Sequence, residues 1–153
     1  TSLFFGLGSF QAKFAVLFPT LSVAGTEYIA RIGFGDTTTS ADNTDGVYFE
    51  YDRATSGNVW RLKTASAGTR TATASAIAIV ANTWYKLQID VNAAGTSVAY
   101  TVDGTSAGTI TTNIPTTTSA RSGLTLQILR SSGGGTLNVD YATYNYTLTS
   151  ARY

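Results

Sequence analysis

The segment from Thr83 to Gly104 constrains the fold more than any other part of this sequence. Within it, apolar side chains recur at every second position: Tyr85, Leu87, Ile89 and Val91, then Val98, Tyr100 and Val102. A period of two is typical of a β-strand that buries one face. Between the two runs, residues 92–96 include Asn and Gly, which favour a tight reversal of the chain. The segment therefore predicts a β-hairpin that ends at the turn Asp103-Gly104.

Similar short alternating runs recur along the whole chain, and we count about eleven candidate strands and no helix. They include residues 10–18, 28–34, 47–51, 69–73, 77–80, 124–128 and 137–141, with glycine-rich connections between many of them. Many short strands separated by such turns are typical of a sandwich. We therefore predict an all-β fold, a single antiparallel two-sheet sandwich that spans residues 1–153, with Trp84 in or near its core.

Composition excludes several kinds of protein. The 153 residues suffice for one domain, and they include no Cys, His or Met. A formal charge of +1 gives no reason to expect binding to nucleic acid. No apolar run approaches the roughly 20 residues of a membrane-spanning helix, so we expect no membrane insertion. Because the sequence begins with Thr rather than Met, we expect it to be part of a longer translated product.

The hairpin also resembles a known superfamily. A Trp before an alternating strand, a short turn with Gly, and a second strand ending in Val-Asp-Gly at residues 102–104 are similar to the concanavalin A-like lectin/glucanase superfamily, in its laminin G-like form. Tyr28–Asp36 and Gly46–Asp52 resemble the early strands of such domains. The resemblance implies a jelly roll, and domains of this kind are often appended to phage structural proteins. It implies a fold more strongly than an activity.

Catalytic chemistry has few candidate residues. Without His or Cys, the chain lacks the usual Ser-His and Cys-His nucleophile pairs and the usual zinc ligands. Glycosidases of the resembled superfamily use carboxylates on one strand, as Glu50 and Asp52 are placed here. However, Arg53 and Ala54 follow where laminarinase-type members have a second glutamate. We interpret Glu50 as a carboxylate on a solvated strand face, paired with Arg53, and predict that the chain is not an enzyme.

A calcium site is the one metal site that the sequence suggests. Asp36, Asp42 and Asp45 lie in a segment rich in Asp, Asn and Thr, and calcium prefers six to eight oxygen ligands. The superfamily often binds calcium in loops at one rim of the sandwich. The alternative is a plain turn stabilised by Asn and Asp side chains. No other cofactor is expected.

Tyrosines and loops are the candidates for binding a partner. Tyr48, Tyr144 and Tyr146 are candidate binding residues, because exposed tyrosines stack on sugar rings or dock proteins. The alternative is that they fill the core or its rim. We also expect binding by loops at one rim, namely Asp36–Gly46 and Arg130–Gly135.

Two functions remain open. The first is a non-catalytic structural or attachment module on the surface of a tailed phage, as a capsid decoration or a receptor-binding part of the tail. Its partners would be other virion proteins or copies of itself in a homo-oligomer, and possibly a cell-surface glycan. The alternative is a lectin-like carbohydrate-binding module of a secreted bacterial protein.

Overall fold

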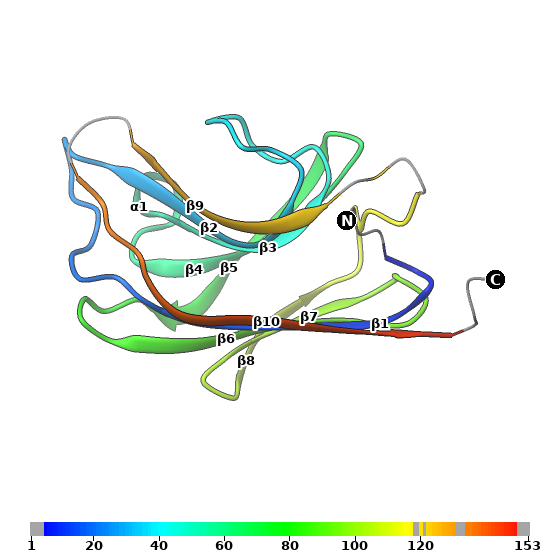
Figure 1. The fold of residues 1–153 in the computed structure, drawn as a ribbon. Coiled ribbons are helices and arrows are strands. Elements are labelled where there is room, and N and C mark those ends of the chain that lie inside the picture. Colours follow the sequence, from blue (N-terminus) through cyan, green and yellow to red (C-terminus); the bar gives the residue numbers. More distant parts are fainter. Residues whose placement is uncertain (1–4, 118–119, 121, 131–133, 150–153) are drawn as a thin grey trace.

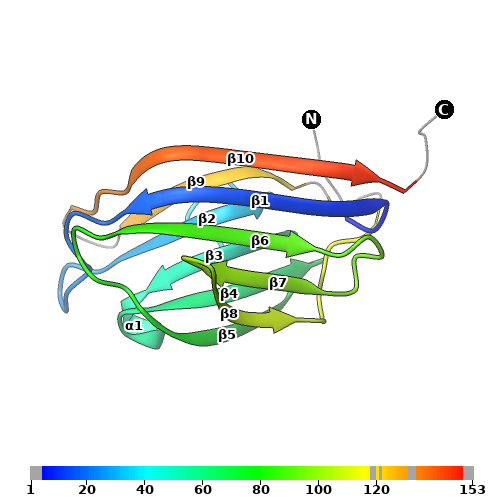
Figure 2. The same ribbon diagram turned by 90° about the horizontal axis from the view of Figure 1, so that it is seen from below.

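The computed structural model describes residues 5–117, 120, 122–130 and 134–149, which form a sandwich of two antiparallel five-stranded sheets (Figure 1). The strands are β1 (Gly8–Leu17), β2 (Tyr28–Gly35), β3 (Gly46–Asp52), β4 (Val59–Ser66), β5 (Thr69–Ala78), β6 (Trp84–Val91), β7 (Val98–Val102), β8 (Thr105–Ile110), β9 (Gly123–Arg130) and β10 (Asn138–Leu148). The β1 sheet has the order β10-β1-β6-β7-β8, and the β3 sheet has the order β5-β4-β3-β2-β9. Figure 2 shows the β1 sheet in front of the β3 sheet, with β10 and β9 at the same side of the sandwich.

The structure confirms the predicted all-β sandwich. β6 and β7 form the expected hairpin, in which Leu87 pairs with Val102 and Ile89 with Tyr100. The described residues contain ten strands, because residues 69–78 form one long strand, β5, in place of two. They also contain one short helix, α1 (Arg53–Ser56), where none was expected. Asp52 caps this turn by accepting a hydrogen bond from the Thr55 N–H at 3.4 Å.

Aromatic side chains join the two sheets in the core. Phe49 of the β3 sheet packs edge-on against Tyr100 of the β1 sheet, with ring centroids 5.2 Å apart. Trp60 contacts Tyr85 in the same way at 5.6 Å. The Tyr100 hydroxyl donates a hydrogen bond across the sandwich to the Lys63 carbonyl at 2.7 Å, and burial raises the pKa of Tyr100. Each such ring removes a large apolar area from water, so these contacts hold the two sheets together.

Trp84 lies outside this core, which corrects the prediction made from the hairpin. It is 49% exposed, whereas Tyr85 beside it is buried. The physical reason is the period of two itself, since neighbouring residues of a strand face opposite sides of the sheet. Tyr85 shares the inner face with Leu87, so Trp84 must face outward.

In the described part of the chain, no helix has the length and apolar character to cross a bilayer.

Candidate functional site

Charged and polar side chains line the outer face of the β3 sheet. Strand register aligns Gln127, Arg31, Glu50 and Arg61 in one row across β9, β2, β3 and β4. The neighbouring row consists of Thr125, Gly33, Tyr48 and Lys63. The alternate residues of these strands face the core. In Figure 1 the ribbon of this sheet is concave on its outer side, and the connection from β2 to β3, residues 36–45, lies over it. We call this segment the covering loop.

Glu50 is the centre of the first row, and it is only 2% exposed. Its carboxylate accepts hydrogen bonds from Arg31 Nε at 3.0 Å and Arg61 Nη1 at 2.9 Å. Lys63 Nζ adds a third at 3.2 Å. A buried carboxylate needs such partners, because burying an unpaired charge is very costly. The predicted partner, Arg53, lies elsewhere, 3.8 Å from Glu27. The interpretation of Glu50 as a solvated carboxylate paired with Arg53 is therefore wrong.

Asp42 fastens the covering loop to these cations. Its carboxylate accepts hydrogen bonds from Lys63 Nζ and, at 2.6 Å, from the Tyr48 hydroxyl. Arg31 Nη2 lies 3.3 Å away and Arg70 Nε 3.5 Å away. Burial raises the pKa of Asp42, but the hydrogen bonds and nearby positive charges outweigh it, and the net effect is a lowered pKa. Asp42 therefore stays ionised and holds the loop to the sheet.

Side chains from the sheet also bind the backbone of the covering loop. Arg31 donates to the Ala41 carbonyl at 2.8 Å, and Gln127 donates to the Thr39 carbonyl at 2.8 Å. Arg70 donates to the carbonyl of Asn43, also at 2.8 Å. With the backbone held from β9, β2 and β5, the loop presents a fixed surface. Such preorganisation lowers the entropic cost of binding a ligand.

Inside the loop, the fully buried Asn43 lies against Gly35 of β2. A Cβ atom on Gly35 would fall 2.2 Å from Asn43 Oδ1, so only glycine fits there. Asn43 Oδ1 in turn accepts hydrogen bonds from the backbone N–H groups of Asp36 at 3.1 Å and Thr37 at 3.2 Å. These bonds fix the start of the loop beside β9.

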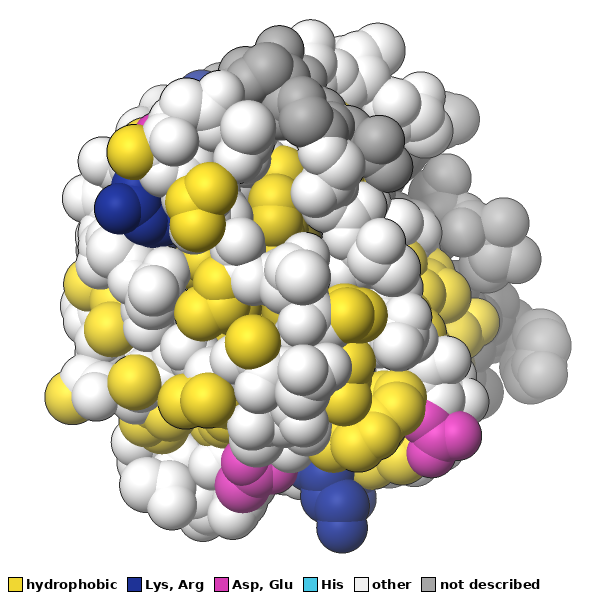
Figure 3. Space-filling model, turned by 90° about the vertical axis from the view of Figure 1, so that its left-hand side faces the viewer, with side chains coloured by type: hydrophobic (Ala, Val, Ile, Leu, Met, Phe, Trp, Pro, Cys, Tyr) yellow, Lys and Arg dark blue, Asp and Glu magenta, His cyan; other side chains and the backbone are white. Residues whose placement is uncertain are grey.

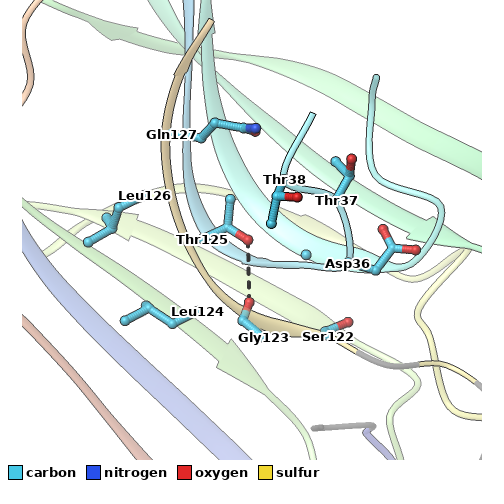
Figure 4. Close-up of a pocket in the computed structure, with 10 residues that line it drawn as sticks. Asp36, Thr37, Thr38, Ser122, Gly123, Leu124, Thr125, Leu126 and Gln127 are labelled. Carbon is cyan, nitrogen blue, oxygen red and sulfur yellow. Dashed lines mark hydrogen bonds between the residues drawn. The ribbon is translucent and has the colours of Figure 1, made fainter. Parts of the chain in front are cut away.

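A groove of about 450 Å³ runs between the start of the covering loop and β9. Figure 4 shows Thr125 and Gln127 pointing toward Thr37 and Thr38, whereas Leu124 and Leu126 point away. The remaining lining residues are Gly35, Asp36, Ser122 and Gly123. The groove is therefore lined by hydroxyl, amide and backbone groups together with a similar share of apolar surface.

Two buried polar atoms of this lining have no hydrogen-bond partner among the described residues. They are the hydroxyl oxygen of Ser122 and Oε1 of Gln127. Ser122 is 1% exposed, so its hydroxyl is shielded from bulk water. A buried polar group without a partner is unfavourable and calls for an explanation. Both residues line the same groove, and a rotation of either side chain toward it would bring its unpartnered atom within reach of an external hydrogen-bonding ligand.

The three carboxylates predicted to bind calcium form hydrogen bonds or ion pairs with other parts of the chain. Asp36 Oδ1 accepts from the Thr44 N–H at 2.8 Å, and Asp45 Oδ1 accepts from the Ala67 N–H at 2.9 Å. Asp42 is bonded to cations, as described above. Across the described ranges, no group of three or more acidic side chains is placed to hold a metal ion. Asp36 and Asp45 thus form the hydrogen bonds that the alternative interpretation, a turn stabilised by Asn and Asp, requires, and a calcium site stays a prediction.

Tyr48 is not an exposed binding residue, which corrects that prediction. It faces outward from the β3 sheet as alternation requires, yet it is fully buried beneath the covering loop. Its neighbour on β2 is Gly33, where a Cβ atom would lie 2.8 Å from that of Tyr48. Burial raises the pKa of Tyr48, and its hydrogen bond to Asp42 raises it further. Tyr48 therefore supports the loop through its hydroxyl group.

Tyr144 and Tyr146 lie on β10, an edge strand of the β1 sheet. At this side of the sandwich β9 is the edge strand of the other sheet. Tyr144 is 54% exposed and contacts Phe34 edge-on at 5.6 Å. Tyr146 is half-buried, and its ring centroid lies 6.2 Å from that of Phe10. Both tyrosines therefore close the end of the aromatic core, and Tyr144 remains accessible there. Of the second predicted binding loop, residues 131–133 lie outside the described residues.

Asp36, Thr37 and Thr38 of the groove belong to the predicted binding loop Asp36–Gly46. The β9 side of the groove and the charged residues around Glu50 were not predicted. Thr125 and Gln127 lie in β9 and Ser122 directly precedes it, and nothing in the sequence of this segment marks them. The charged residues had a signal: only 12% of the chain is charged, yet three adjacent strands carry charge at outward positions. Since this concentration is unusual on one face, it indicates a special surface.

Solved structures with this fold include galectins and alginate lyases. The protein SO2946 of unknown function from Shewanella oneidensis MR-1 superposes with a TM-score of 0.65 at 15% identity, covering 96% of this chain and 61% of that one. Sheep galectin-11 in complex with glycerol superposes with a TM-score of 0.58 at 14% sequence identity, and the match covers 95% of both chains. The alginate lyase AlgAT5 of polysaccharide lyase family 7 superposes with a TM-score of 0.59 at 11% identity, covering 92% of this chain and 60% of the lyase. At these identities the similarity shows the fold alone, and the chain spans only about three fifths of SO2946 and of the lyase.

These comparisons correct the prediction that the chain is not an enzyme. The same fold carries catalysis in several alginate lyases, so the fold gives no ground for excluding it here. They also support the jelly-roll part of the resemblance seen in the sequence, without its phage association. A comparison with curated protein sequences gives no match. Residues 2–140 match the family model "SO2946-like, C-terminal domain", and the chain belongs to this family.

Proposed function

We propose that this domain binds carbohydrate, and that the glycan lies in the groove between the covering loop and β9. The observation that carries the proposal is the pair of unpartnered buried atoms in the groove, on Ser122 and Gln127. A sugar hydroxyl both donates and accepts hydrogen bonds. Once these two side chains rotate toward the groove, a sugar hydroxyl can donate to Gln127 Oε1 and either donate to or accept from the hydroxyl of Ser122.

The rest of the lining suits the same class of ligand. Thr37, Thr38 and Thr125 supply further hydroxyl groups beside the pair. Among the described residues that line the groove there is no cation, and Asp36 is the one carboxylate, so a polar, uncharged ligand fits better than an anion. A volume of about 450 Å³ lies within the usual range of small-molecule sites.

The fold supports the proposal in a general way. Sheep galectin-11 has been solved with glycerol, and an alginate lyase with the substrate GGMG. The same sandwich therefore accommodates polyhydroxylated ligands in other proteins. The matches reported above give no support for a role on a virion surface, which remains a prediction from the sequence.

The test is a glycan array followed by calorimetry on the best ligand. Because only a few neutral hydrogen bonds are available, we expect a dissociation constant of roughly 0.1–1 mM. Gln127→Ala should weaken binding about tenfold, and Ser122→Ala by a smaller factor. Thr109→Ala, an exposed threonine on β8 of the other sheet, is the matched control and should bind as the wild type does.

Two outcomes would contradict the proposal. One is the absence of binding to any neutral glycan at millimolar concentration. The other is an unchanged affinity in a folded Gln127→Ala variant, which would place the ligand elsewhere. The same incubations should be analysed for shortened glycan chains, because lyases share this fold.

A further inference from the structure

The outer face of the β1 sheet carries a separate feature, in which two exposed aromatic residues flank a small one. Ala15 on β1 pairs with Tyr141 on β10 at one side and with Lys86 on β6 at the other. Trp84 lies two residues before Lys86 on β6, so all four side chains share the outer face. Trp84 is 49% exposed and Tyr141 is 36% exposed, whereas Ala15 is 6% exposed.

These residues enclose a cleft of about 430 Å³ that is lined by Ala15, Trp84, Lys86, Asp103, Asp140 and Tyr141. Ala15 is the smallest of them, so the cleft has room between the two rings. Figure 3 shows the end of the molecule at the left of Figure 1. At its lower edge, where the β1 sheet lies, hydrophobic side chains adjoin both acidic and basic ones. The cleft thus combines apolar walls with charged groups at its rim.

The backbone places both carboxylates of the rim. Strand register shifts between Ala15 and Val16, which pair with Tyr141 and Val139, and the extra residue on β10 is Asp140. Asp103 has a φ of 50° in the turn before Gly104. Its Oδ1 accepts a hydrogen bond from the Lys86 N–H at 2.8 Å, and its own N–H donates to the Lys86 carbonyl at 2.8 Å. Asp103 is therefore fixed beside Lys86.

A smaller cavity of about 220 Å³ continues the cleft along the sheet. It shares Lys86 and Tyr141 with the cleft and adds Lys13, Leu87, Gln88, Thr101 and Gly104. Over the combined surface, two lysines balance two aspartates. No net charge therefore selects an ionic ligand, and the polar groups are placed to form hydrogen bonds around an uncharged one.

We propose that this cleft is a second binding site, and that it takes the pyranose ring of a neutral sugar. A pyranose has an apolar C–H face, which stacks on aromatic rings such as Trp84 and Tyr141. Its hydroxyl groups lie at the rim of the ring, where the carboxylates of Asp103 and Asp140 accept hydrogen bonds and Lys86 donates them. The adjoining cavity holds the next sugar of the chain. This site lies on the opposite side of the sandwich from the β9 groove, and the inference does not depend on that groove.

The two tryptophans give a direct readout. Trp60 is fully buried and Trp84 is half-exposed, so acrylamide quenching of fluorescence reports mainly on Trp84. Neutral hexasaccharides of glucose, mannose and galactose should be titrated to about 10 mM, a limit suited to weak sites. At least one of them should shield Trp84 from acrylamide and shift its emission to shorter wavelength.

Variants locate the effect. Tyr141→Ala should weaken the sugar affinity measured by fluorescence at least tenfold. Ala15→Leu should abolish the fluorescence response by filling the floor of the cleft. Trp84→Ala, followed by calorimetry, should lose the same binding. Gln127→Ala is the control that separates this site from the β9 groove and should leave the response unchanged. Circular dichroism and thermal unfolding establish that each variant is folded.

Four results would overturn the inference. The first is that none of the three hexasaccharides shields Trp84. The second is shielding that persists in both Tyr141→Ala and Ala15→Leu. The third is shielding that grows with protein concentration in the absence of sugar, which would mean that a second copy of the chain covers the cleft. Loss of the response in Gln127→Ala as well would also contradict a separate site.

Discussion

The two outer faces of the sandwich are built from similar sequence patterns, yet they differ in what covers them. On the β3 sheet, the outward residues Arg31, Tyr48 and Glu50 are buried under a loop. On the β1 sheet, the outward residues Trp84 and Tyr141 are exposed. The period of two in a strand assigns each residue to a face of its sheet. Whether that face is solvated depends on where a connecting segment of about ten residues lies.

This difference sets what each face can do. The covered face uses its charges to hold the loop, and its ligand site is the groove at the edge of that loop. The open face leaves its aromatic rings accessible and has a site formed by the strands alone. The following predictions test this division, beginning with the residue that we expect to matter most for stability.

Removing the carboxylate of Glu50 should have the largest effect. Glu50→Ala leaves Arg31, Arg61 and Lys63 without their shared partner on a buried surface. Breaking a buried ion pair in this way costs about 3–5 kcal/mol of the free energy of unfolding. Urea titration followed by fluorescence measures the change.

The matched control is Glu27→Gln, at a half-exposed ion pair with Arg53. Exposed pairs contribute about 0–1 kcal/mol, so this variant should be nearly as stable as the wild type. Equal losses in the two variants would mean that the covered face is no more sensitive to charge than the open surface.

Asp42 should make the covered face sensitive to acid. Because its pKa is lowered in the folded state, its contribution is complete above the unfolded pKa of about 3.9 and is lost as the pH falls through the lower folded value. Asp42→Asn should cost about 1.5–3 kcal/mol at pH 7, as for hydrogen bonds to charged groups. It should also flatten the loss of stability below about pH 4. Urea titrations from pH 2 to 7 would check both effects.

Asp45→Asn is the control, since Asp45 accepts only a backbone hydrogen bond among the interactions described above. If Asp42→Asn keeps the acid sensitivity of the wild type, another carboxylate holds the covering loop.

The two faces also explain which parts of the structure the sequence could predict. Alternation predicted the β6–β7 hairpin and the two sheets, because strand register and core burial depend on the same period. Alternation correctly placed Tyr48 on the outer face of its sheet. Tyr48 is nevertheless buried, because the covering loop lies over it. The prediction for Trp84 was wrong for a simpler reason. Its size suggested the core, although it lies an odd number of residues from Leu87 and therefore faces the opposite side of the strand. Ser122 and Gln127 could not be found, since a groove between a loop and a strand depends on contacts that are distant in sequence.

Gly35→Ala should loosen the covering loop without changing any charge. The new Cβ would fall 2.2 Å from Asn43 Oδ1, so Asn43 must move away from β2. Such overpacking costs roughly 1–3 kcal/mol. Hydrogen exchange should become faster at Asp36 and Thr37, whose N–H groups Asn43 now holds. The control is Gly134→Ala, since a Cβ at Gly134 would have open space around it, and this variant should leave hydrogen exchange in the covering loop unchanged. Gly57 is not suitable as a control position because its φ of 72° strains any residue with a Cβ.

The smallest effect on stability is expected for Trp84→Ala, although tryptophan is the largest side chain. Trp84 lies on the open face with half of its surface in water, so the variant should change the free energy of unfolding by no more than about 1 kcal/mol. Trp60→Ala provides the comparison, since Trp60 is fully buried between Phe49 and Tyr85 and its loss should cost about 3–5 kcal/mol. Urea titrations followed by circular dichroism measure both variants without relying on tryptophan fluorescence. A large loss in Trp84→Ala would mean that this ring supports the sandwich, and the open face would then have no side chain reserved for a ligand.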